Sequence, residues 1–140
     1  MAQLVLLDAG PLVAVLDKRE QWHAWAVAQM SKVQPPLLTC EAVITEACFL
    51  LQQHPSALRQ LHQWAAQGLI KLLPLPEGGP VSTFASMQRY ANVPMSFADA
   101  SLLLHAESLP QTRIFTLDKD FTIYRHADGS PPILLAPFAE

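Results

Sequence analysis

The stretch LVLLDAGPLVAVLD, Leu4 to Asp17, decides the fold. It opens with four apolar residues in a row and then reaches Asp8 and a short turn. An apolar run without polar alternation is typical of a strand buried on both faces, as in a parallel sheet. Pro11 fits the first turn of a helix that follows at once. The stretch therefore predicts a buried strand, an aspartate at its carboxyl end, and a helix.

Helices and strands are expected to alternate along the rest of the chain. Helices are predicted over residues 20–33, 40–53, 56–68, 81–90 and 96–108, and extended segments over residues 36–39, 69–75, 113–116 and 132–136. Thr39 is a suitable N-cap for the second of these helices. The alternation favours an α/β sandwich with a central, mostly parallel sheet. The length suits one domain spanning residues 1–140.

Charge is scarce in this chain, so its placement is informative. Of the 140 residues, 51% are hydrophobic and 15% are charged, and the formal net charge is -3. This balance excludes a strongly basic surface, so any contact with nucleic acid has to be local. An acidic residue beside an apolar segment therefore merits attention.

Two features predict a cytoplasmic protein without a membrane anchor. Cys40 and Cys48 lie eight residues apart in the sequence. On one helix this is ~12 Å along the axis, too far for a disulfide, and reduced cysteines are typical of the cytosol. The apolar N-terminus lacks a basic start, and Asp8 interrupts it before it reaches membrane length. We therefore expect neither a signal peptide nor a membrane helix.

Two aspartates follow predicted strands. Asp8 ends the first strand, and Asp118 lies in TLDKDF, which follows the strand over residues 113–116. Ligands bind outside the carboxyl ends of the strands in open α/β sheets. Carboxylates about 4 to 6 Å apart repel by a few kcal/mol at an effective dielectric near 20. Such a pair is avoided unless a cation lies between its members.

Two further carboxylates are candidates for the same site. Ser96-x-x-Asp99 has the spacing of a capping box, so Asp99 has a structural role available as well as a functional one. Glu46 is expected on the flank of its helix, between the core stripe and the polar side that carries Glu41. A carboxylate on that flank is able to reach a neighbouring cleft.

The TLDKDF stretch leaves two roles open for several of its residues. Aspartates are common in turns, and Asp120 suits either a turn cap or a ligand of a second metal or water. Thr116 suits either of two roles: an ordinary β-branched strand residue, or a residue whose hydroxyl holds a carboxylate or a water.

The chain has no Cys/His spacing of the zinc type, and carboxylates are hard ligands that suit Mg2+ or Mn2+.

Four motifs in order resemble the PIN-domain ribonucleases, in particular the VapC-like toxins of bacterial toxin-antitoxin modules. They are LLDAGPLVAVLD, VITEACFLL, SFADASLLLHAE and IFTLDKDF. The resemblance implies an α/β/α sandwich, hydrolysis of RNA phosphodiester bonds, a homodimer, and inhibition by a protein antitoxin. It also implies that one or two Mg2+ or Mn2+ ions bind where four carboxylates converge: Asp8, Glu46, Asp99 and Asp118. Asp120 is an additional candidate ligand, with Thr116 and Ser96 in supporting positions.

Two positions depart from the pattern of that family, and two other functions compete. Leu117 stands where members of that family usually have a polar residue, and His105 stands near the position where they usually have a small hydroxyl residue. A phosphatase of the haloacid-dehalogenase type also begins with an aspartate after its first strand, but it requires a second aspartate where this chain has Gly10. A PIN-like module that binds RNA or protein without cleaving it is the remaining alternative.

Overall fold

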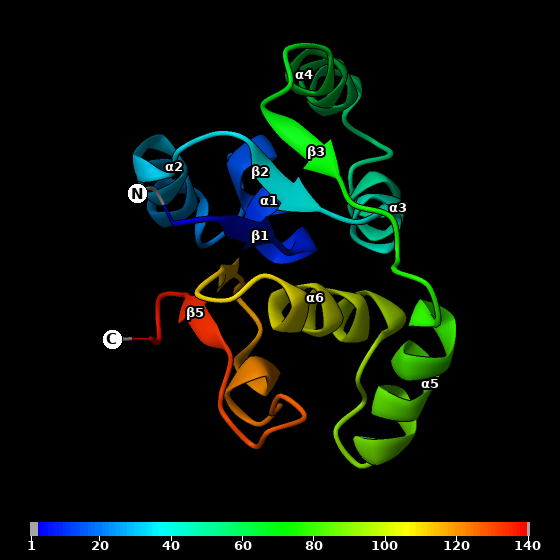
Figure 1. The fold of residues 1–140 in the computed structure, drawn as a ribbon. Helices are drawn as coiled ribbons and strands as arrows, with labels where there is room; N and C mark the ends of the chain where they lie inside the picture. Colours follow the sequence, from blue (N-terminus) through cyan, green and yellow to red (C-terminus); the bar gives the residue numbers. More distant parts are fainter. Residues whose placement is uncertain (1–2, 140) are drawn as a thin grey trace.

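A computed structural model describes residues 3–139 of the chain (Figure 1). The strands are β1 (Val5–Leu7), β2 (Leu37–Thr39), β3 (Ile70–Leu72), β4 (Arg113–Phe115) and β5 (Ile133–Leu135). The α-helices are α1 (Ala9–Leu16), α2 (His23–Lys32), α3 (Glu41–Leu50), α4 (Pro55–Ala66), α5 (Gly79–Arg89) and α6 (Phe97–Ser108). A 3-10 helix, η1 (Lys119–Thr122), follows β4.

The five strands form one sheet in the order β3-β2-β1-β4-β5, and every pairing is parallel. The predicted α/β fold with a mostly parallel sheet is thus confirmed. In Figure 1, α2, α3 and α4 surround the half of the sheet that contains β2 and β3, α6 lies beside the other half, and α5 packs against α6. The central strands β1 and β2 are buried along their whole length, which explains why they are apolar on both faces, whereas the edge strands β3 and β5 are partly exposed.

The side of the sheet on which successive strands are added changes between β1 and β4, although all strands remain parallel. After β1 it adds β2 and β3 on one side, and it then crosses to β4 and β5 on the other side. In open α/β sheets the crevice at this switch point is where ligands bind. The backbone N–H of Asp8 donates to the carbonyl of Phe115 at 3.0 Å, so the ends of β1 and β4 are joined directly there.

The predicted N-cap of α3 is wrong by one residue. Thr39 belongs to β2 and is fully buried, and its hydroxyl donates to the carbonyl of Leu7 at 2.8 Å. Cys40 occupies the N-cap position instead, without a side-chain capping bond. A threonine after an apolar run suits either the last position of a strand or the N-cap of a helix. Here Thr39 is the last residue of β2.

Other element boundaries differ by a few residues. Helix α2 begins at His23 rather than at residue 20, and α3 ends at Leu50 rather than near residue 53. The buried side of α3 includes Val43, which is 0% exposed, whereas the predicted core residue Ile44 is only half-buried. The predicted start of α6 is confirmed, because Ser96 is its N-cap.

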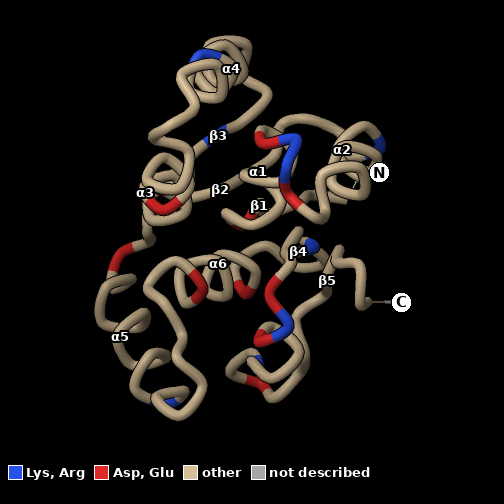
Figure 2. Tube along the Cα trace, turned by 180° about the vertical axis from the view of Figure 1, so that it is seen from behind, with Lys and Arg blue, Asp and Glu red and all other residues tan. Residues whose placement is uncertain are grey.

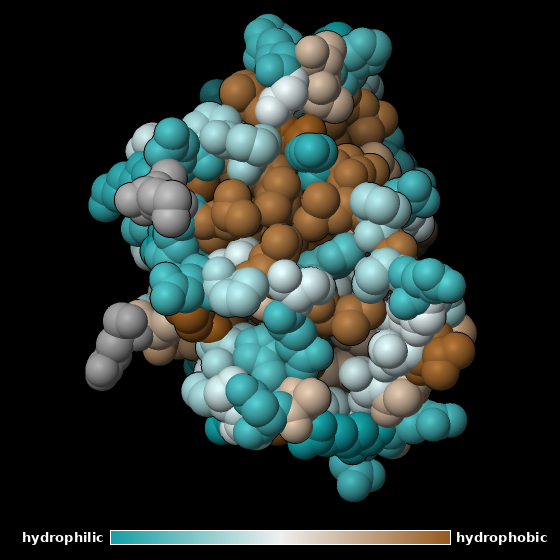
Figure 3. Space-filling model, in the orientation of Figure 1, coloured by the Kyte–Doolittle hydropathy of each residue, from teal (hydrophilic) through white to brown (hydrophobic). Residues whose placement is uncertain are grey.

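Apolar side chains also reach the surface. Figure 3 shows an apolar area in front of the strands, between α2 and α4. No helix within residues 3–139 combines the length and the apolar character that crossing a membrane requires.

Candidate metal and nuclease site

Asp8 lies at the switch point and is 6% exposed. It is the N-cap of α1, because its Oδ1 accepts the backbone N–H of Ala9 at 2.8 Å. Its Oδ2 accepts the hydroxyl of Thr116 at 2.7 Å. Both oxygens are therefore held by hydrogen bonds, which fixes the plane of the carboxylate at the end of β1.

Thr116 joins Asp8 to the last acidic motif. Its hydroxyl donates to Asp8 and accepts the backbone N–H of Asp118 at 3.0 Å, and the residue is fully buried. Of the two roles that the sequence left open, the structure shows the one in which the hydroxyl holds a carboxylate. This contact links two segments that are 108 residues apart.

Asp99 lies in the first turn of α6 and is 8% exposed. It forms the predicted capping box with Ser96: its backbone N–H donates to the Ser96 hydroxyl at 3.0 Å, and its Oδ2 accepts the Ser96 N–H at 3.3 Å. The hydroxyl of Tyr124 also donates to Oδ2, at 3.3 Å. The structural role of Asp99 is thus present, and it leaves part of the carboxylate without a hydrogen bond.

The carboxylates at the switch point disfavour one another's charged forms. The pKa of Asp8 is raised to about 7, mainly by burial and also by the negative charges of Asp99 and Glu46, while hydrogen bonds from Thr116 and Ala9 act to lower it. Burial is also the main cause that raises the pKa of Asp99 to about 6, and Asp118 adds to it. Four carboxylates from separate parts of the chain therefore act on one another electrostatically.

The charge of these carboxylates is not paired among the residues that the structure describes. Among residues 3–139, none of the ion pairs involves Asp8, Glu46, Asp99, Asp118 or Asp120. Figure 2 marks the acidic positions of α6 and of the segment that follows β4, and of these Asp99 and Asp118 act on each other through their charges. A buried acidic group without a basic partner has the charge and the ligand chemistry that favour a divalent cation.

The spacing of these side chains limits how many of them bind one ion. In the part of the chain that the structure describes, no three Asp, Glu, His or Cys side chains are close enough to hold a metal ion together. Mg2+ usually keeps several waters and takes only one or two protein carboxylates, so the site fits this mode of binding. The set of four converging ligands stays a prediction.

Glu46 and Asp120 lie at the margin of the group. Glu46 is exposed on α3 and acts on Asp8 through its charge. Asp120 is half-exposed in η1, and its backbone N–H donates to Oδ1 of Asp118 at 2.9 Å. Asp118 thus caps η1, so the turn-cap role that the sequence offered for Asp120 belongs to Asp118 in the structure.

Two further residues, Tyr124 and His105, have surroundings that the sequence did not reveal. Tyr124, which contacts Asp99, received no role from its sequence context, because the contact joins residues 25 positions apart and no local pattern indicates it. His105 is buried in α6, its Nε2 has no hydrogen-bond partner among the described residues, and burial lowers its pKa. It is a packed histidine away from the carboxylates.

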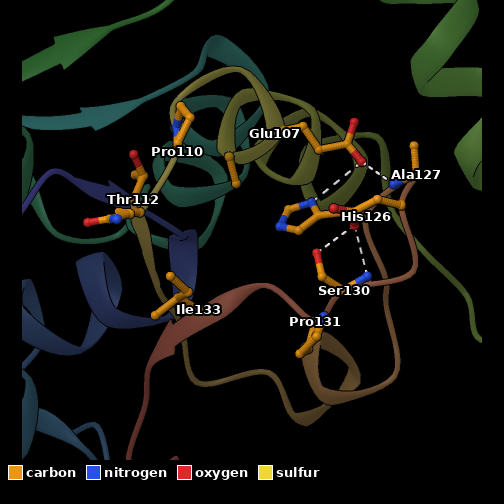
Figure 4. A pocket seen from close by; sticks show the side chains of 11 residues that line it. Glu107, Pro110, Thr112, His126, Ala127, Ser130, Pro131 and Ile133 are labelled. Carbon is orange, nitrogen blue, oxygen red and sulfur yellow. Dashed lines mark hydrogen bonds and ion pairs between the residues drawn. The ribbon is translucent and has the colours of Figure 1, made fainter.

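A hollow of about 580 Å³ lies elsewhere, at the opposite ends of β4 and β5 (Figure 4). Glu107 and His126 meet there, with His126 Nδ1 and Glu107 Oε1 3.4 Å apart, and Glu107 also accepts the backbone N–H of Ala127 at 2.6 Å. These contacts tie the end of α6 to the loop before β5. The hollow contains none of the carboxylates at the switch point.

Comparison with known proteins agrees with this architecture. The family model of the PIN domain matches residues 5–127. The chain belongs to the PIN-domain family. A solved structure of the Mycobacterium tuberculosis toxin VapC20, described as cleaving the sarcin-ricin loop, is similar with a TM-score of 0.72 at 15% sequence identity. The match covers 85% of this chain and 93% of the VapC20 chain, and at that identity it shows the fold. A search of curated proteins found no match.

Proposed function

We propose that this PIN-domain protein is a metal-dependent endoribonuclease that hydrolyses RNA phosphodiester bonds. The observation that supports it most is the pair of buried carboxylates, Asp8 and Asp99, at the switch-point crevice without a basic partner. An uncompensated acidic pair is costly in a protein without a cation, and Mg2+ or Mn2+ is the cation that such oxygens suit.

The residues have distinct roles in this proposal. Asp8 and Asp99 bind the ion, and Asp118 and Glu46 add negative charge that attracts it. Asp120 is a further candidate ligand, and the Thr116 hydroxyl orients Asp8. A divalent ion held there would supply positive charge to the phosphate and lower the pKa of a water for attack on phosphorus.

The fold shared with VapC20 supports a narrower proposal. VapC20 is described as a toxin that cleaves the sarcin-ricin loop. We extend to this chain the class of activity, an RNA-cleaving toxin held inactive by a protein antitoxin in the cytoplasm, and not the particular RNA. The formal net charge of -3 argues against a broad basic surface, so contact with RNA has to be local.

Cleavage of a mixed RNA pool by the purified protein tests the activity. We expect Mn2+ or Mg2+ to produce fragments and excess EDTA to prevent them. Helix α3 offers a matched pair of variants: Glu46, which acts on Asp8 through its charge, and Glu41, which does not. Glu46→Gln is expected to slow cleavage about 10- to 100-fold because it weakens attraction of the ion, and Glu41→Gln is expected to leave the rate unchanged.

The outcomes separate the competing functions. Cleavage that persists in EDTA at the same rate would contradict a metal-dependent mechanism. Saturable binding of RNA without fragments in either metal would favour the non-catalytic PIN-like module. Equal rates for both glutamate variants would remove Glu46 from the site and leave the aspartates to be tested.

We also propose that the chain forms a homodimer. The four most exposed of its large apolar side chains lie on two helices, Phe49 and Leu50 on α3 and Val81 and Phe84 on α5. Val81 is 75% exposed and Phe49 is 68% exposed. Apolar side chains gathered on exposed helices are typical of an interaction surface.

Light scattering of the eluted protein tests the dimer. Wild type is expected at twice the mass of one chain, and Phe49→Glu with Val81→Glu is expected to elute at the mass of one chain, because burying two charges in an apolar interface is unfavourable. Leu4→Glu with Ile133→Glu is the matched control, since both side chains are apolar, less exposed and outside these helices. This double variant is expected to remain a dimer. A wild type that remains monomeric when its concentration is raised 100-fold would overturn the proposal.

A further inference from the structure

Tyr124 lies between the acidic group and two other aromatic rings. It is 0% exposed, and its ring packs edge-to-face against Tyr90 and Phe121, with centroids 5.1 Å apart in each pair. The hydroxyl of Tyr90 accepts the backbone N–H of Arg125 at 2.8 Å, which holds the chain next to Tyr124. Packing on both sides of the ring leaves the Tyr124 hydroxyl little freedom of position.

That hydroxyl is directed at one oxygen of Asp99. It donates to Oδ2 at 3.3 Å, and the backbone N–H of Ser96 donates to the same oxygen at 3.3 Å. Among the described residues, Oδ1 of Asp99 accepts no hydrogen bond. The carboxylate therefore has one oxygen held by the protein and one oxygen available to a ligand.

We propose that Tyr124 is a positioning residue for the metal site, whose hydroxyl holds Oδ2 of Asp99 so that Oδ1 faces the divalent cation. The inference rests on the proposed function, since it assigns the orientation of a carboxylate that binds the ion. Partners that hold a metal ligand in place commonly affect metal affinity without touching the metal.

The contacts to Oδ2 of Asp99 come from a phenol hydroxyl and a backbone N–H, and both are neutral donors. Both contacts to Oδ2 are long for hydrogen bonds, so they orient the carboxylate while leaving most of its charge for a cation.

The two tyrosines of the chain supply a matched pair of variants. Tyr124→Phe removes the hydroxyl that contacts Asp99, whereas Tyr90→Phe removes a hydroxyl from the same aromatic cluster that contacts only backbone. Isothermal titration with Mn2+ is expected to show about tenfold weaker binding for Tyr124→Phe and unchanged binding for Tyr90→Phe. In RNA cleavage at saturating Mn2+, we expect Tyr124→Phe to lower kcat and to leave KM for RNA unchanged.

A spectroscopic measurement covers the case in which Tyr124→Phe does not fold. Wild type labelled with 3-fluorotyrosine gives one 19F resonance from each tyrosine, and Tyr90→Phe assigns them. Titration with Mg2+ is expected to shift the Tyr124 resonance with the midpoint of Mg2+ binding, because its hydroxyl contacts a ligand of the ion. The Tyr90 resonance is expected to stay in place, which a general change in core packing would not produce.

The outcomes distinguish this inference from the proposed function. If Asp99→Asn binds Mn2+ as tightly as wild type does, or wild type binds none, the metal site itself is wrong. If wild type binds Mn2+ through Asp99 but Tyr124→Phe binds it equally well, only the positioning role is overturned. A Tyr124 resonance that does not move at saturating Mg2+, in a protein whose Mg2+ binding depends on Asp99, overturns it as well.

Discussion

Asparagine in place of Asp8 is expected to make the metal-free protein more stable at pH 8 than wild type, while it slows RNA cleavage about a thousandfold, or about 4 kcal/mol in activation free energy. Most substitutions of buried residues lower stability. Here the wild-type carboxylate is held in a position that disfavours its charge, so the neutral amide of the same shape removes an unfavourable group. An effect of opposite sign on stability and on activity is expected of a side chain retained for function.

The pH dependence follows from the raised pKa of Asp8, about 7 in the folded protein against 3.8 for an unperturbed aspartate in the unfolded chain. Between these values the unfolded chain has lost the proton and the folded chain retains it. The stability of the metal-free wild type is therefore full below the lower value, falls as the pH rises toward 7, and is constant above it. The full decrease attributed to Asp8 is about 4 kcal/mol. Asp99, with a pKa of about 6, adds a decrease in the same direction over a narrower range.

Urea denaturation in EDTA at pH 5 and pH 8 measures this prediction. Wild type is expected to lose stability between the two conditions, and Asp8→Asn is expected to lose much less. Asp128→Asn is the control, because hydrogen bonds from Ser130 lower the pKa of Asp128 and neutralising it gains nothing. With millimolar Mn2+ the order at pH 8 should reverse, since wild type gains binding free energy that Asp8→Asn lacks. Equal stability of the two proteins at pH 8 in EDTA would contradict the electrostatic cost assigned to Asp8.

The parts of the site that could be predicted from the sequence are those set by position along strands and helices. Asp8 and Asp118 were found because each follows an apolar strand, and parallel strands bring their carboxyl ends to one edge. Asp99 was found because the capping-box spacing fixes it in the first turn of a helix. Such local patterns determine the position of a residue on its strand or helix. That position is sufficient to place the residue near the switch point.

The parts that could not be predicted depend on packing between segments distant in the sequence. The contact of Tyr124 with Asp99 requires η1 to fold back on α6, and nothing local to Tyr124 indicates that partner. The exchange of roles between Thr39 and Cys40 has a similar cause, because the carbonyl of Leu7 on the neighbouring strand is the acceptor that retains Thr39 in β2. The distances between the carboxylates also depend on this packing. Among the described residues these distances bring no three such side chains close enough to bind one metal ion together, whereas the motifs predicted four.

Valine in place of Thr116 is expected to cost more stability at pH 8 than at pH 5 and to slow RNA cleavage. Valine matches the shape of threonine and suits the end of a strand, so the change removes little more than the hydroxyl. That hydroxyl donates to Asp8 and accepts from the backbone of Asp118. A hydrogen bond to a charged group contributes about 1.5 to 3 kcal/mol, against about 1 kcal/mol for a neutral one. The loss is therefore largest where Asp8 is ionised.

The pKa of Asp8 is expected to rise in Thr116→Val, because the lost hydrogen bond is the main influence that lowers it. The pH range over which metal-free stability falls should then extend upward, and the pH above which Mn2+ binds should rise with it, since the ion binds the deprotonated carboxylate. Thr116→Ser keeps the hydroxyl and is expected to restore both properties. A stability loss of equal size at pH 5 and pH 8 would assign Thr116 to packing alone.

The two threonines that flank β4 make this comparison unusually direct. Thr112 is 4% exposed and Thr116 is 0% exposed, and they lie at opposite ends of the same strand. The Thr112 hydroxyl has no hydrogen-bond partner among the described residues, so Thr112→Val removes a buried polar atom without breaking a bond. It should leave stability unchanged or raise it at both pH values, with no effect on cleavage. Because shape, burial and strand are matched, the difference between the two valine variants reports what the two hydrogen bonds of the Thr116 hydroxyl contribute, and the part of it that depends on pH is assigned to the contact with Asp8.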